Sequence, residues 1–342
     1  MPRPHSQTVT LTDVARLARV SVATASKALN DRAEVAPETR RRVLRAAKEL
    51  EFQPNILARG LILGRTGTVG LLTDELAGRF AFPVLLGAEN ALGNSQMSVL
   101  LCDARGDAIR RRHYIRTLVA RHVDGFIVVG DRNDVRPSLS RDIPVPVVYV
   151  YGESDDPDDL SILADDRGGA VLAAEHLISL GRRRIAHITG EEAYRAARDR
   201  VTGLRSVLDD AGLPLMGDRP FYGEWTQRWG RQAAHILLSA HPDIDAIFCG
   251  SDQIATGVAD ALHDLGRRVP HDVALVGYDN WELFAAECRP PLTTVDLNLQ
   301  QLGTDAVAHL LEALDGDRRT GIIRQPGRLI IRDSTAPAST RP

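Results

Sequence analysis

The chain begins with a short pattern of helically spaced apolar residues. Thr10 and Asp13 have the spacing of a capping box, in which the Thr10 hydroxyl caps a helix and Asp13 reaches back to it. Val14, Leu17 and Ala18 then provide an apolar helix face. The pattern predicts a first helix that runs only to about residue 18.

Two further helical patterns follow directly. Ser21 is placed as the N-cap of a second helix, and Pro37 opens a third that runs to about residue 50. The apolar face of the second helix consists of Val22, Ala25, Ala28 and Leu29. Two short helices joined by so tight a turn predict a helix-turn-helix.

From residue 68 onward, short unbroken apolar runs alternate with amphipathic segments. The runs, each a predicted strand, are 69–72, 99–102, 126–129, 147–150, 185–188, 246–249 and 273–276. The predicted helices lie near residues 82–94, 107–121, 168–180, 200–211, 227–239, 253–265 and 298–314. Unbroken apolar strands that alternate with helices are typical of parallel sheets covered on both faces. Because these strand–helix units are too many for one compact lobe, we expect two doubly wound α/β lobes.

Composition is that of a soluble globular protein. Of the residues, 44% are apolar and 25% are charged. A chain of 342 residues is too long to fold around one ordinary hydrophobic core, so we expect at least two domains. The apolar runs stay far below the ~18 residues of a membrane span, and the N-terminus lacks a secretory signal pattern. Three widely spaced cysteines, Cys102, Cys249 and Cys288, argue against a disulfide framework or a zinc site. We therefore expect a cytoplasmic protein without membrane partner, metal or cofactor.

Charge is distributed unevenly along the chain. Residues 1–66 carry 12 Lys and Arg against 6 Asp and Glu, whereas the remaining residues carry 30 against 39. A basic head on an acidic body is expected when only the head meets a polyanion. A solvated helix surface would explain the same surplus equally well.

The segment TLTDVARLARVSVATASKALN, with VAPETRRRVLRAAKELEFQPNILARGL after it, resembles the DNA-binding head of the lactose-repressor/galactose-repressor (LacI/GalR) family. The resemblance covers residues 8–61 almost without gaps. It implies that the second helix reads bases through Val22, Ala23 and Lys27. Val22 and Ala23 offer apolar contact to a thymine methyl, and Lys27 offers a donor to guanine. Alternatively, Val22 and Ala23 pack between helices.

The same resemblance implies contacts away from the base edges. Short polar side chains suited to phosphate contacts are Ser21, Thr24, Ser26, Asn30 and Asn55. The residues after Asn55 match a hinge helix that orders on operator DNA, with Leu61 as a minor-groove wedge and Ala58 beside it. Alternatively, Leu61 is an ordinary linker residue.

Three positions of the head depart from the family pattern. Arg19 stands where the turn glycine is usual, which costs roughly 1–2 kcal/mol if the backbone is left-handed there. Ala36 replaces a serine cap, and Gly60 lies inside the hinge helix, each at a cost of about 1 kcal/mol. These departures predict a head that depends more on DNA and on dimerisation for its order.

The rest of the chain resembles the effector domain of the same family, which is similar to periplasmic sugar-binding proteins. The motifs that carry this resemblance are GLLTDEL, RHVDGFIVVG, AAEHLISLGRRRIAHITG, ARDRVTGLRSVLDDAGLP, IFCGSDQIATGVADAL, VPHDVALVGYDN and RPPLTTVDLN. The implied domains are a helix-turn-helix domain over 1–53, a hinge helix and linker over 54–66, a bilobal effector domain over 67–333 and a flexible tail over 334–342. Lobe one takes 67–163 and 296–324, and lobe two takes 165–294 and 327–333. The effector lies between the lobes, at the carboxyl ends of strands.

Several effector-binding residues follow from this resemblance. Arg200 matches an arginine that donates to ligand hydroxyls or carboxylates, Asp279 an aspartate that accepts from hydroxyls, and Trp225 an aromatic that stacks on a sugar face. Further candidates after predicted strands are Ser251, Asp252, Asp74 and Phe80. An aromatic ring with Arg and Asp is typical of a polyol site, but it does not exclude a nucleoside.

The effector-site candidates also have purely structural interpretations. Arg200 is alternatively a surface salt-bridge residue, Trp225 a core aromatic and Asp252 the N-cap of the next helix, which is the favoured interpretation of Asp252. Trp281 is either an alternative stacking residue or a side chain that covers the rim of the cleft. Residues 77–80, Ala-Gly-Arg-Phe, replace the familiar Asn-Pro-Phe, so this wall of the site departs from the family pattern.

The chain has none of the catalytic motifs that would indicate an enzyme, such as GxxxxGK[ST], HExxH or GxSxG. We expect a transcriptional repressor that binds a palindromic operator as a homodimer. A mono- or oligosaccharide between the lobes would release it by allosteric coupling. The alternatives are a corepressor-dependent regulator that senses a nucleoside or purine, and a freestanding sugar-binding protein, which would need an export signal.

Overall fold

A computed structural model of the chain describes residues 9–29, 34–52, 65–95 and 97–335. The chain forms two compact units, Met1–Gly67 and Thr68–Pro342. No helix among the described residues is long and apolar enough to cross a membrane.

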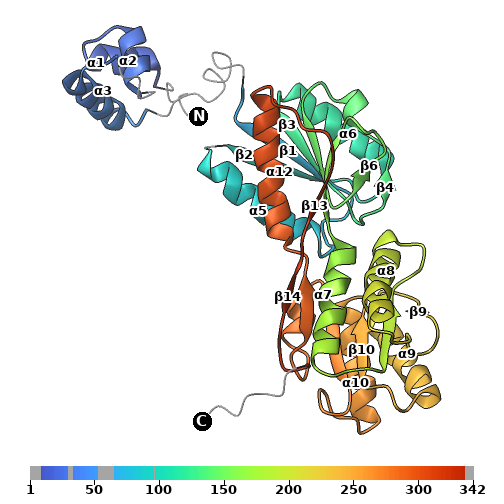
Figure 1. The fold of residues 1–342 in the computed structure, drawn as a ribbon. Helices are drawn as coiled ribbons and strands as arrows, with labels where there is room; N and C mark the ends of the chain where they lie inside the picture. The colour runs from blue at the N-terminus through green and yellow to red at the C-terminus, as the bar shows by residue number, and fades with distance from the viewer. Residues whose placement is uncertain (1–8, 30–33, 53–64, 96, 336–342) are drawn as a thin grey trace, which may run out of the picture. The chain divides into compact units, whose positions relative to one another are not determined.

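Three helices lie in the described part of the first unit. They are α1 (Leu11–Leu17), α2 (Val22–Leu29) and α3 (Pro37–Glu49) (Figure 1). The expected capping box is present, because the Asp13 carboxylate accepts hydrogen bonds from the Thr10 amide (3.0 Å) and hydroxyl (2.6 Å). Ser21 caps α2 by accepting a hydrogen bond from the Thr24 amide at 3.1 Å. The helix-turn-helix predicted from the spacing is therefore confirmed.

Small side chains fill the core of this unit. The buried residues are Val14, Ala15, Ala18, Ala25, Ala28, Val35, Val43, Ala46 and Ala47. Because alanine occupies the inward positions of α2, Val22, Ala23 and Lys27 are exposed on its outward face. The alternative that Val22 and Ala23 pack between helices does not fit this exposure.

The second unit is built on two separate six-stranded sheets. In the first sheet the strand order is β13-β7-β5-β3-β1-β2, and neighbouring strands are parallel. Its strands are β1 (Thr68–Thr73), β2 (Ser98–Asp103), β3 (Gly125–Val129), β5 (Val147–Val150), β7 (Leu160–Ala164) and β13 (Gly321–Gln325). Beside it lie a short pair of strands, β4 (Val135–Arg136) and β6 (Glu153–Ser154), and a 3-10 turn, η1 (Ser140–Asp142). We call this sheet with its helices the first lobe.

Helices cover both faces of the first sheet. They are α5 (Ala81–Asn94), α6 (Ala108–Ala120) and α12 (Leu299–Leu314). α5 and α12 lie side by side and pack on the face that includes Leu71 and Ile127, whereas α6 packs on the opposite face with Leu72 and Phe126 (Figure 1). Burial on both faces explains why these strands appear in the sequence as unbroken apolar runs.

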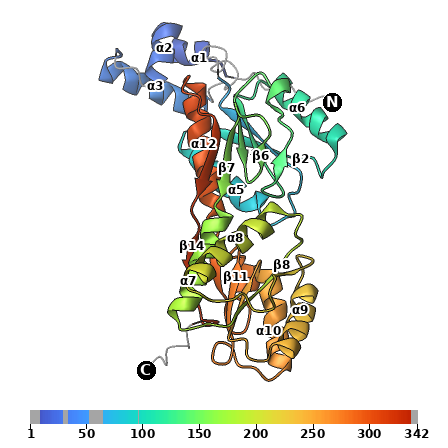
Figure 2. The same cartoon turned by 45° about the vertical axis from the view of Figure 1, so that its right-hand side comes forward.

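The second sheet has the order β14-β12-β11-β10-β8-β9 and carries one antiparallel pair, β12 with β14. Its strands are β8 (Ile185–Thr189), β9 (Phe221–Tyr222), β10 (Ala246–Cys249), β11 (Ala274–Tyr278), β12 (Thr293–Asp296) and β14 (Arg328–Ile330). Its helices are α7 (Asp166–Ser179), α8 (Arg195–Asp210), α9 (Gln227–Ala240), α10 (Asp252–Asp264) and α11 (Glu282–Ala285). α7 and α8 cover one face, and α9 and α10 the other (Figure 2). This is the second lobe.

The chain crosses between the two lobes at three places within the described residues. These crossings lie between β7 and α7, between β12 and α12, and between β13 and β14. Each sheet is therefore assembled from two separated stretches of sequence. The expectation of a helix-turn-helix head followed by two doubly wound α/β lobes is confirmed.

The turn between α1 and α2 contains the left-handed residue that the sequence suggested, since Arg19 has a φ of 53°. We expect Arg19→Gly to stabilise the head by roughly 1 kcal/mol, because glycine adopts this region without steric cost. Hydrogen exchange of the amides in α1 and α2 of the full chain measures this as slower local opening. Arg19→Ala is the matched control, since it removes the guanidinium but keeps the strained Cβ. Unchanged or faster exchange in Arg19→Gly would refute strain at this turn.

Candidate functional site

A cavity of about 370 Å³ lies between the two lobes. Its lining residues lie in the segments that follow the carboxyl ends of strands: β1, β3 and β5 in the first lobe, and β8, β9, β10 and β11 in the second. Three of them, Ala196, Arg200 and Gln253, are in the first turns of the helices α8 and α10 that begin in these segments. The volume falls within the ~300–1,000 Å³ of small-molecule sites, and the carboxyl edge of parallel sheets is their usual place.

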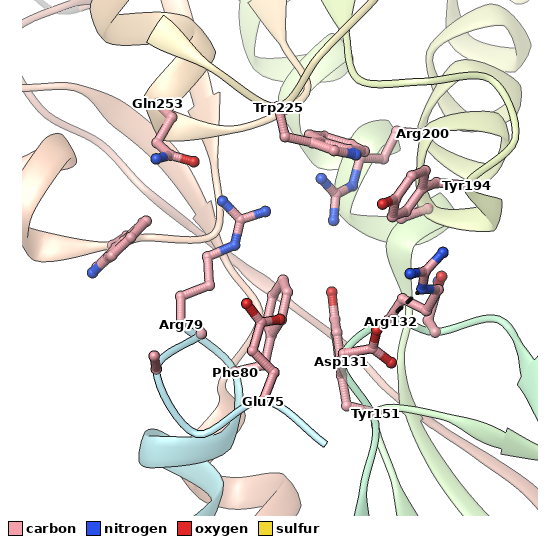
Figure 3. A pocket seen from close by; sticks show the side chains of 15 residues that line it. Glu75, Arg79, Phe80, Asp131, Arg132, Tyr151, Tyr194, Arg200, Trp225 and Gln253 are labelled. Atoms are coloured by element: carbon pink, nitrogen blue, oxygen red, sulfur yellow. Dashed lines mark hydrogen bonds and ion pairs between the residues drawn. The ribbon is translucent and has the colours of Figure 1, made fainter. Parts of the chain in front are cut away.

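Aromatic rings from both lobes form much of the wall. In the first lobe, Phe80 and Tyr151 stack with their ring centroids 4.1 Å apart. In the second, Tyr194 meets Trp225 edge to face at 5.8 Å. Figure 3 shows these two pairs facing the same space from opposite sides. Such walls provide flat apolar faces for a ligand ring.

Arg200 provides the central polar group of the cavity. Its side chain is 1% exposed, and its Nε donates to Asp166 Oδ1 at 2.8 Å while its Nη1 donates to the carbonyl of Gly250. Its guanidinium also lies 3.8 Å from the ring centre of Tyr278. Burial alone lowers the pKa of Arg200, but the nearby carboxylates, Asp166 first, outweigh burial and raise it. Arg200 is therefore a permanent cation in the cavity wall, and the alternative of a surface salt bridge is wrong.

Asp279 lies beside Arg200 at the end of β11. Its carboxylate is 3.0 Å from Arg79 Nη1 and 3.7 Å from Arg200 Nη2, and the side chain is 2% exposed. Burial raises the pKa of Asp279, against the opposing effect of Arg79 and Arg200. Neither carboxylate oxygen accepts a well-oriented hydrogen bond from the described residues. Asp279 therefore has acceptor capacity to offer a ligand.

Polar side chains of the first lobe that follow β3 also line the cavity. Asn133 donates from Nδ2 to Asp166 Oδ2 at 2.6 Å, which joins the first lobe to the carboxylate that holds Arg200. Asp131 pairs with Arg132 at 3.3 Å, and the Arg132 guanidinium lies 4.7 Å from the ring centre of Tyr194 in the second lobe. These contacts bring the lobes together on one side of the cavity.

Two family models match this chain. The model for bacterial regulatory proteins of the lacI family matches residues 10–55, and the model for the periplasmic binding protein-like domain matches residues 174–335. The HTH-type transcriptional repressor PurR of Aliivibrio fischeri (strain MJ11) is 32% identical over 95% of this chain and 98% of its own length. The chain belongs to the LacI family.

Solved structures agree with this assignment. One is the lac repressor dimer bound to operator and the anti-inducer ONPF, whose sequence is 27% identical to this chain. The match covers 96% of this chain and 99% of the repressor chain, with a TM-score of 0.76. Another is the complex of the transcriptional regulator CelR with cellobiose, whose sequence is 30% identical to this chain. This match covers 95% of this chain and 99% of the CelR chain, with a TM-score of 0.65. This LacI-family protein is thus a DNA-binding transcriptional regulator with an effector domain. PurR and the lac repressor, two of the relatives that it resembles, are repressors.

The structure brings only some of the predicted effector residues of this LacI-family protein to the cavity. Phe80, Trp225 and Arg200 line it, whereas Asp279 lines an adjoining cavity. Asp74 lines neither of these cavities; its carboxylate accepts hydrogen bonds from Arg111 and from Arg136. Its position after a strand did not reveal that two neighbouring arginines would engage it.

Ser251 and Asp252 have structural roles in α10. The N-cap is Ser251, whose hydroxyl accepts from the Ile254 amide at 3.3 Å, so the interpretation of Asp252 as the cap is wrong. Asp252 instead accepts hydrogen bonds from the Trp281 amide (2.7 Å) and the Thr294 hydroxyl (2.6 Å). It fixes the position of the Trp281 backbone at the cavity rim.

Sequence reasoning missed several residues of the site. Tyr151 directly follows a predicted strand. Asp74 is a candidate for the same reason, so the sequence also offers a signal for Tyr151. Asp166 opens a helix after β7, a strand that the apolar pattern did not single out. Asn133 and Tyr194 lie in connecting segments without any periodic signal.

The predicted DNA contacts are only partly within the described residues. Val22, Ala23 and Lys27 are exposed on α2, and Lys27 Nζ is 2.5 Å from Glu34 Oε2. Ser21 and Thr24 share a hydrogen bond of 2.8 Å at the start of α2, and Ser26 is half-buried. Asn30, Asn55, Ala58 and Leu61 lie outside the described residues, as does Gly60.

No group of three or more His, Cys, Asp or Glu side chains is placed to hold a metal ion in the described part of the chain. His187 lies on β8, where its Nδ1 is 2.8 Å from the Phe248 carbonyl oxygen. Burial lowers the pKa of His187 to about 4, so it is neutral at physiological pH.

Asp252 makes the stability of the effector domain depend on pH. Burial, assisted by the charge of Asp279, raises its pKa from 3.8 to about 8, so the folded state favours the protonated carboxyl. Its contribution to the free energy of unfolding is present at acid pH and is lost as the pH rises toward about 8. We expect Asp252→Asn to flatten the decline in stability between about pH 5 and pH 8, measured by urea unfolding. Identical pH profiles in both proteins would contradict this assignment.

Proposed function

We propose that this LacI-family protein is a repressor that binds a palindromic operator as a homodimer and is released by a sugar-type effector bound between its lobes. The observation that carries the effector class is the composition of the cavity. Aromatic faces from both lobes surround a buried Arg200, with Asn133 on the wall and Asp279 beside it. We infer that the protein acts by binding alone, on DNA in the cytoplasm, and needs no cofactor.

The chemistry of a sugar fits this set of groups. The apolar faces of a pyranose ring stack on aromatic side chains such as Trp225 and Phe80, and its hydroxyls both donate and accept hydrogen bonds. Arg200 is a donor only, and a carboxylate such as that of Asp279 is an acceptor only. The relative CelR, which was solved with cellobiose, supports a saccharide as the ligand class.

For the head, we propose that α2 reads bases through Val22, Ala23 and Lys27. The phosphate contacts would come from Ser21, Thr24, Ser26, Asn30 and Asn55. The exposure of α2 supports this orientation. In the hinge, Ala58 and Leu61 would enter the minor groove at the centre of the operator.

The homodimer is supported by an exposed apolar surface on the first lobe. Leu100 and Leu101 on the edge strand β2 are each 36% exposed, and Phe82 on the neighbouring helix α5 is 55% exposed. Leu100 and Leu101 are consecutive in β2, so their side chains point to opposite faces of the sheet. Exposed apolar residues on an edge strand are typical of edges that pair with another chain. Two copies would place two α2 helices on a palindrome.

We also propose the domain limits given by the sequence. The helix-turn-helix domain would span 1–53, the hinge and linker 54–66, the effector domain 67–333 and the tail 334–342. Ser334 and Thr335 are buried, however, and they form hydrogen bonds with β11 and β12, so the prediction of a flexible tail is wrong for these two residues. Lobe one would take 67–163 and 296–324, and lobe two 165–294 and 327–333. The strands of the two sheets fall within these limits to within two residues, which supports them.

A nucleoside or purine corepressor is the second candidate. The stacked pair of Phe80 and Tyr151 opposite Tyr194 and Trp225 forms walls that a flat nucleobase would also fit. Similarity to PurR is compatible with this alternative. A thermal-shift panel of mono- and disaccharides, nucleosides and purine bases separates the two, because a ligand that binds only the folded state raises the melting temperature. Stabilisation by a nucleoside or base and by no sugar would overturn the saccharide proposal.

The hinge assignment is testable on an operator recovered by selection from random-sequence DNA. We expect Leu61→Ala to lower affinity for this operator by roughly 1–3 kcal/mol and to leave affinity for random DNA almost unchanged, because the wedge acts only in a kinked site. Titration of both DNAs with both proteins measures the difference. An equal loss on both DNAs would show that Leu61 is no wedge.

The effector assignment is tested at Asp279. We expect Asp279→Asn to weaken binding of the stabilising sugar by about tenfold or more, because the charged acceptor for ligand hydroxyls is lost. Operator titrations with and without the sugar measure the loss of release. A variant that binds operator and is still released at the same sugar concentration would contradict a role for Asp279.

A further inference from the structure

Arg79 lies in the segment of the first lobe that departs from the family pattern, between β1 and α5. Its side chain crosses the space between the lobes, and its Nη1 is 3.0 Å from Asp279 Oδ2 in the second lobe. The guanidinium also lies 4.7 Å from the ring centre of Phe80 and 5.9 Å from that of Trp281. Figure 3 shows Arg79 rising from its loop into the middle of the site.

Arg79 separates Asp279 from the cavity of about 370 Å³ described above, which we call the central cavity. A second cavity, of about 730 Å³, adjoins it. Asp279 lines the second cavity but does not line the central cavity. Arg79, Phe80 and Trp281 line both cavities. The carboxylate that a ligand in the central cavity would need is thus behind the Arg79 side chain.

The pairing of Arg79 with Asp279 is incomplete. Arg79 Nε is buried without a hydrogen-bond partner among the described residues, and both Asp279 oxygens also lack a well-oriented donor. Arg200, the other cation near Asp279, is already engaged by Asp166. The desolvation cost of a buried ion pair is only partly offset when some of its polar atoms have no hydrogen bond. A ligand that forms well-oriented hydrogen bonds with Asp279 therefore competes well with Arg79 for this carboxylate.

We propose that Arg79 occupies the place of the effector on Asp279, and that binding an uncharged polyol with adjacent hydroxyls displaces it. One hydroxyl would donate to Asp279, and its neighbour would accept from the displaced Arg79. An anionic ligand would attract Arg79 but be repelled by Asp279, so this exchange selects against it. The inference rests on the proposed function, because it assumes that the sugar-type effector binds in this cavity.

A second ion pair between the lobes provides a matched control. Glu153 in β6 of the first lobe pairs with Arg195 at the start of α8 in the second lobe. Neither residue lines either cavity. Glu153→Gln therefore removes a contact between the lobes and leaves the path between the central cavity and Asp279 unchanged.

The test is calorimetric titration of the full chain, wild type, Arg79→Gln and Glu153→Gln, with D-glucose, cellobiose and D-gluconate. If Arg79 holds Asp279 in about nine of ten molecules, its removal lowers the apparent Kd for a neutral sugar about tenfold. Arg79→Lys, which keeps the charge, should lie between the wild type and Arg79→Gln. The Kd of Glu153→Gln should change far less than that of Arg79→Gln, because only Arg79 stands between the cavity and Asp279. An unchanged or higher Kd in Arg79→Gln would overturn the proposal, as would tighter binding of D-gluconate than of D-glucose by the wild type.

Failure of the sugar proposal itself is distinguishable. If no sugar binds any variant, the effector class is wrong, and hydrogen exchange of the ligand-free proteins decides the role of Arg79. Arg79→Gln should speed exchange in residues 75–80 and 279–284, and Glu153→Gln should leave these segments unchanged. Unchanged exchange in Arg79→Gln would show that the ion pair does not hold the site.

Discussion

The site between the lobes depends on the requirement that a fully buried guanidinium be compensated. Arg200 is 1% exposed, and an unpaired charge at that depth would cost several kcal/mol. Its partners come from distant parts of the chain: Asp166 at the start of α7, the Gly250 carbonyl after β10 and Asp279 after β11. Satisfying this one side chain therefore fixes the strand ends of the second lobe around the cavity.

The same requirement connects the second lobe to the first. Asp166, which holds Arg200, also accepts a hydrogen bond from Asn133, and Asp279 is paired with Arg79. The first-lobe partners thus meet the buried network on two sides, close to the crossing between β7 and α7. A ligand that changes these contacts changes the relative free energies of lobe arrangements, and its leverage equals its differential affinity for them.

Much of the architecture could be predicted from the sequence because burial on both faces of a sheet produces unbroken apolar runs. β12 escaped this pattern since its sequence, Thr-Thr-Val-Asp, is polar, although Thr293 and Thr294 are fully buried and hydrogen-bonded. The short strands β9 and β14 contain two and three residues, too few to show any period.

The site was less predictable than the fold. Family resemblance indicated Arg200, Trp225 and Asp279, but the position of a residue after a strand does not say which neighbours will engage it. Asp74 and Asp252 illustrate this limit. The Asp74 carboxylate forms ion pairs with two arginines, and the Asp252 carboxylate accepts hydrogen bonds from a backbone amide and a threonine hydroxyl. Such contacts are made between residues far apart in the sequence, so no local pattern records them.

The most direct measurement is the capture of genomic fragments from the source organism on the purified full-length protein, with and without a panel of sugars and nucleosides, followed by sequencing. The account predicts that the retained fragments share one palindrome with a central CG step and that one sugar of the panel releases them. Retention without any shared palindrome, or no retention under any condition, would contradict the account of a dimeric, effector-controlled repressor.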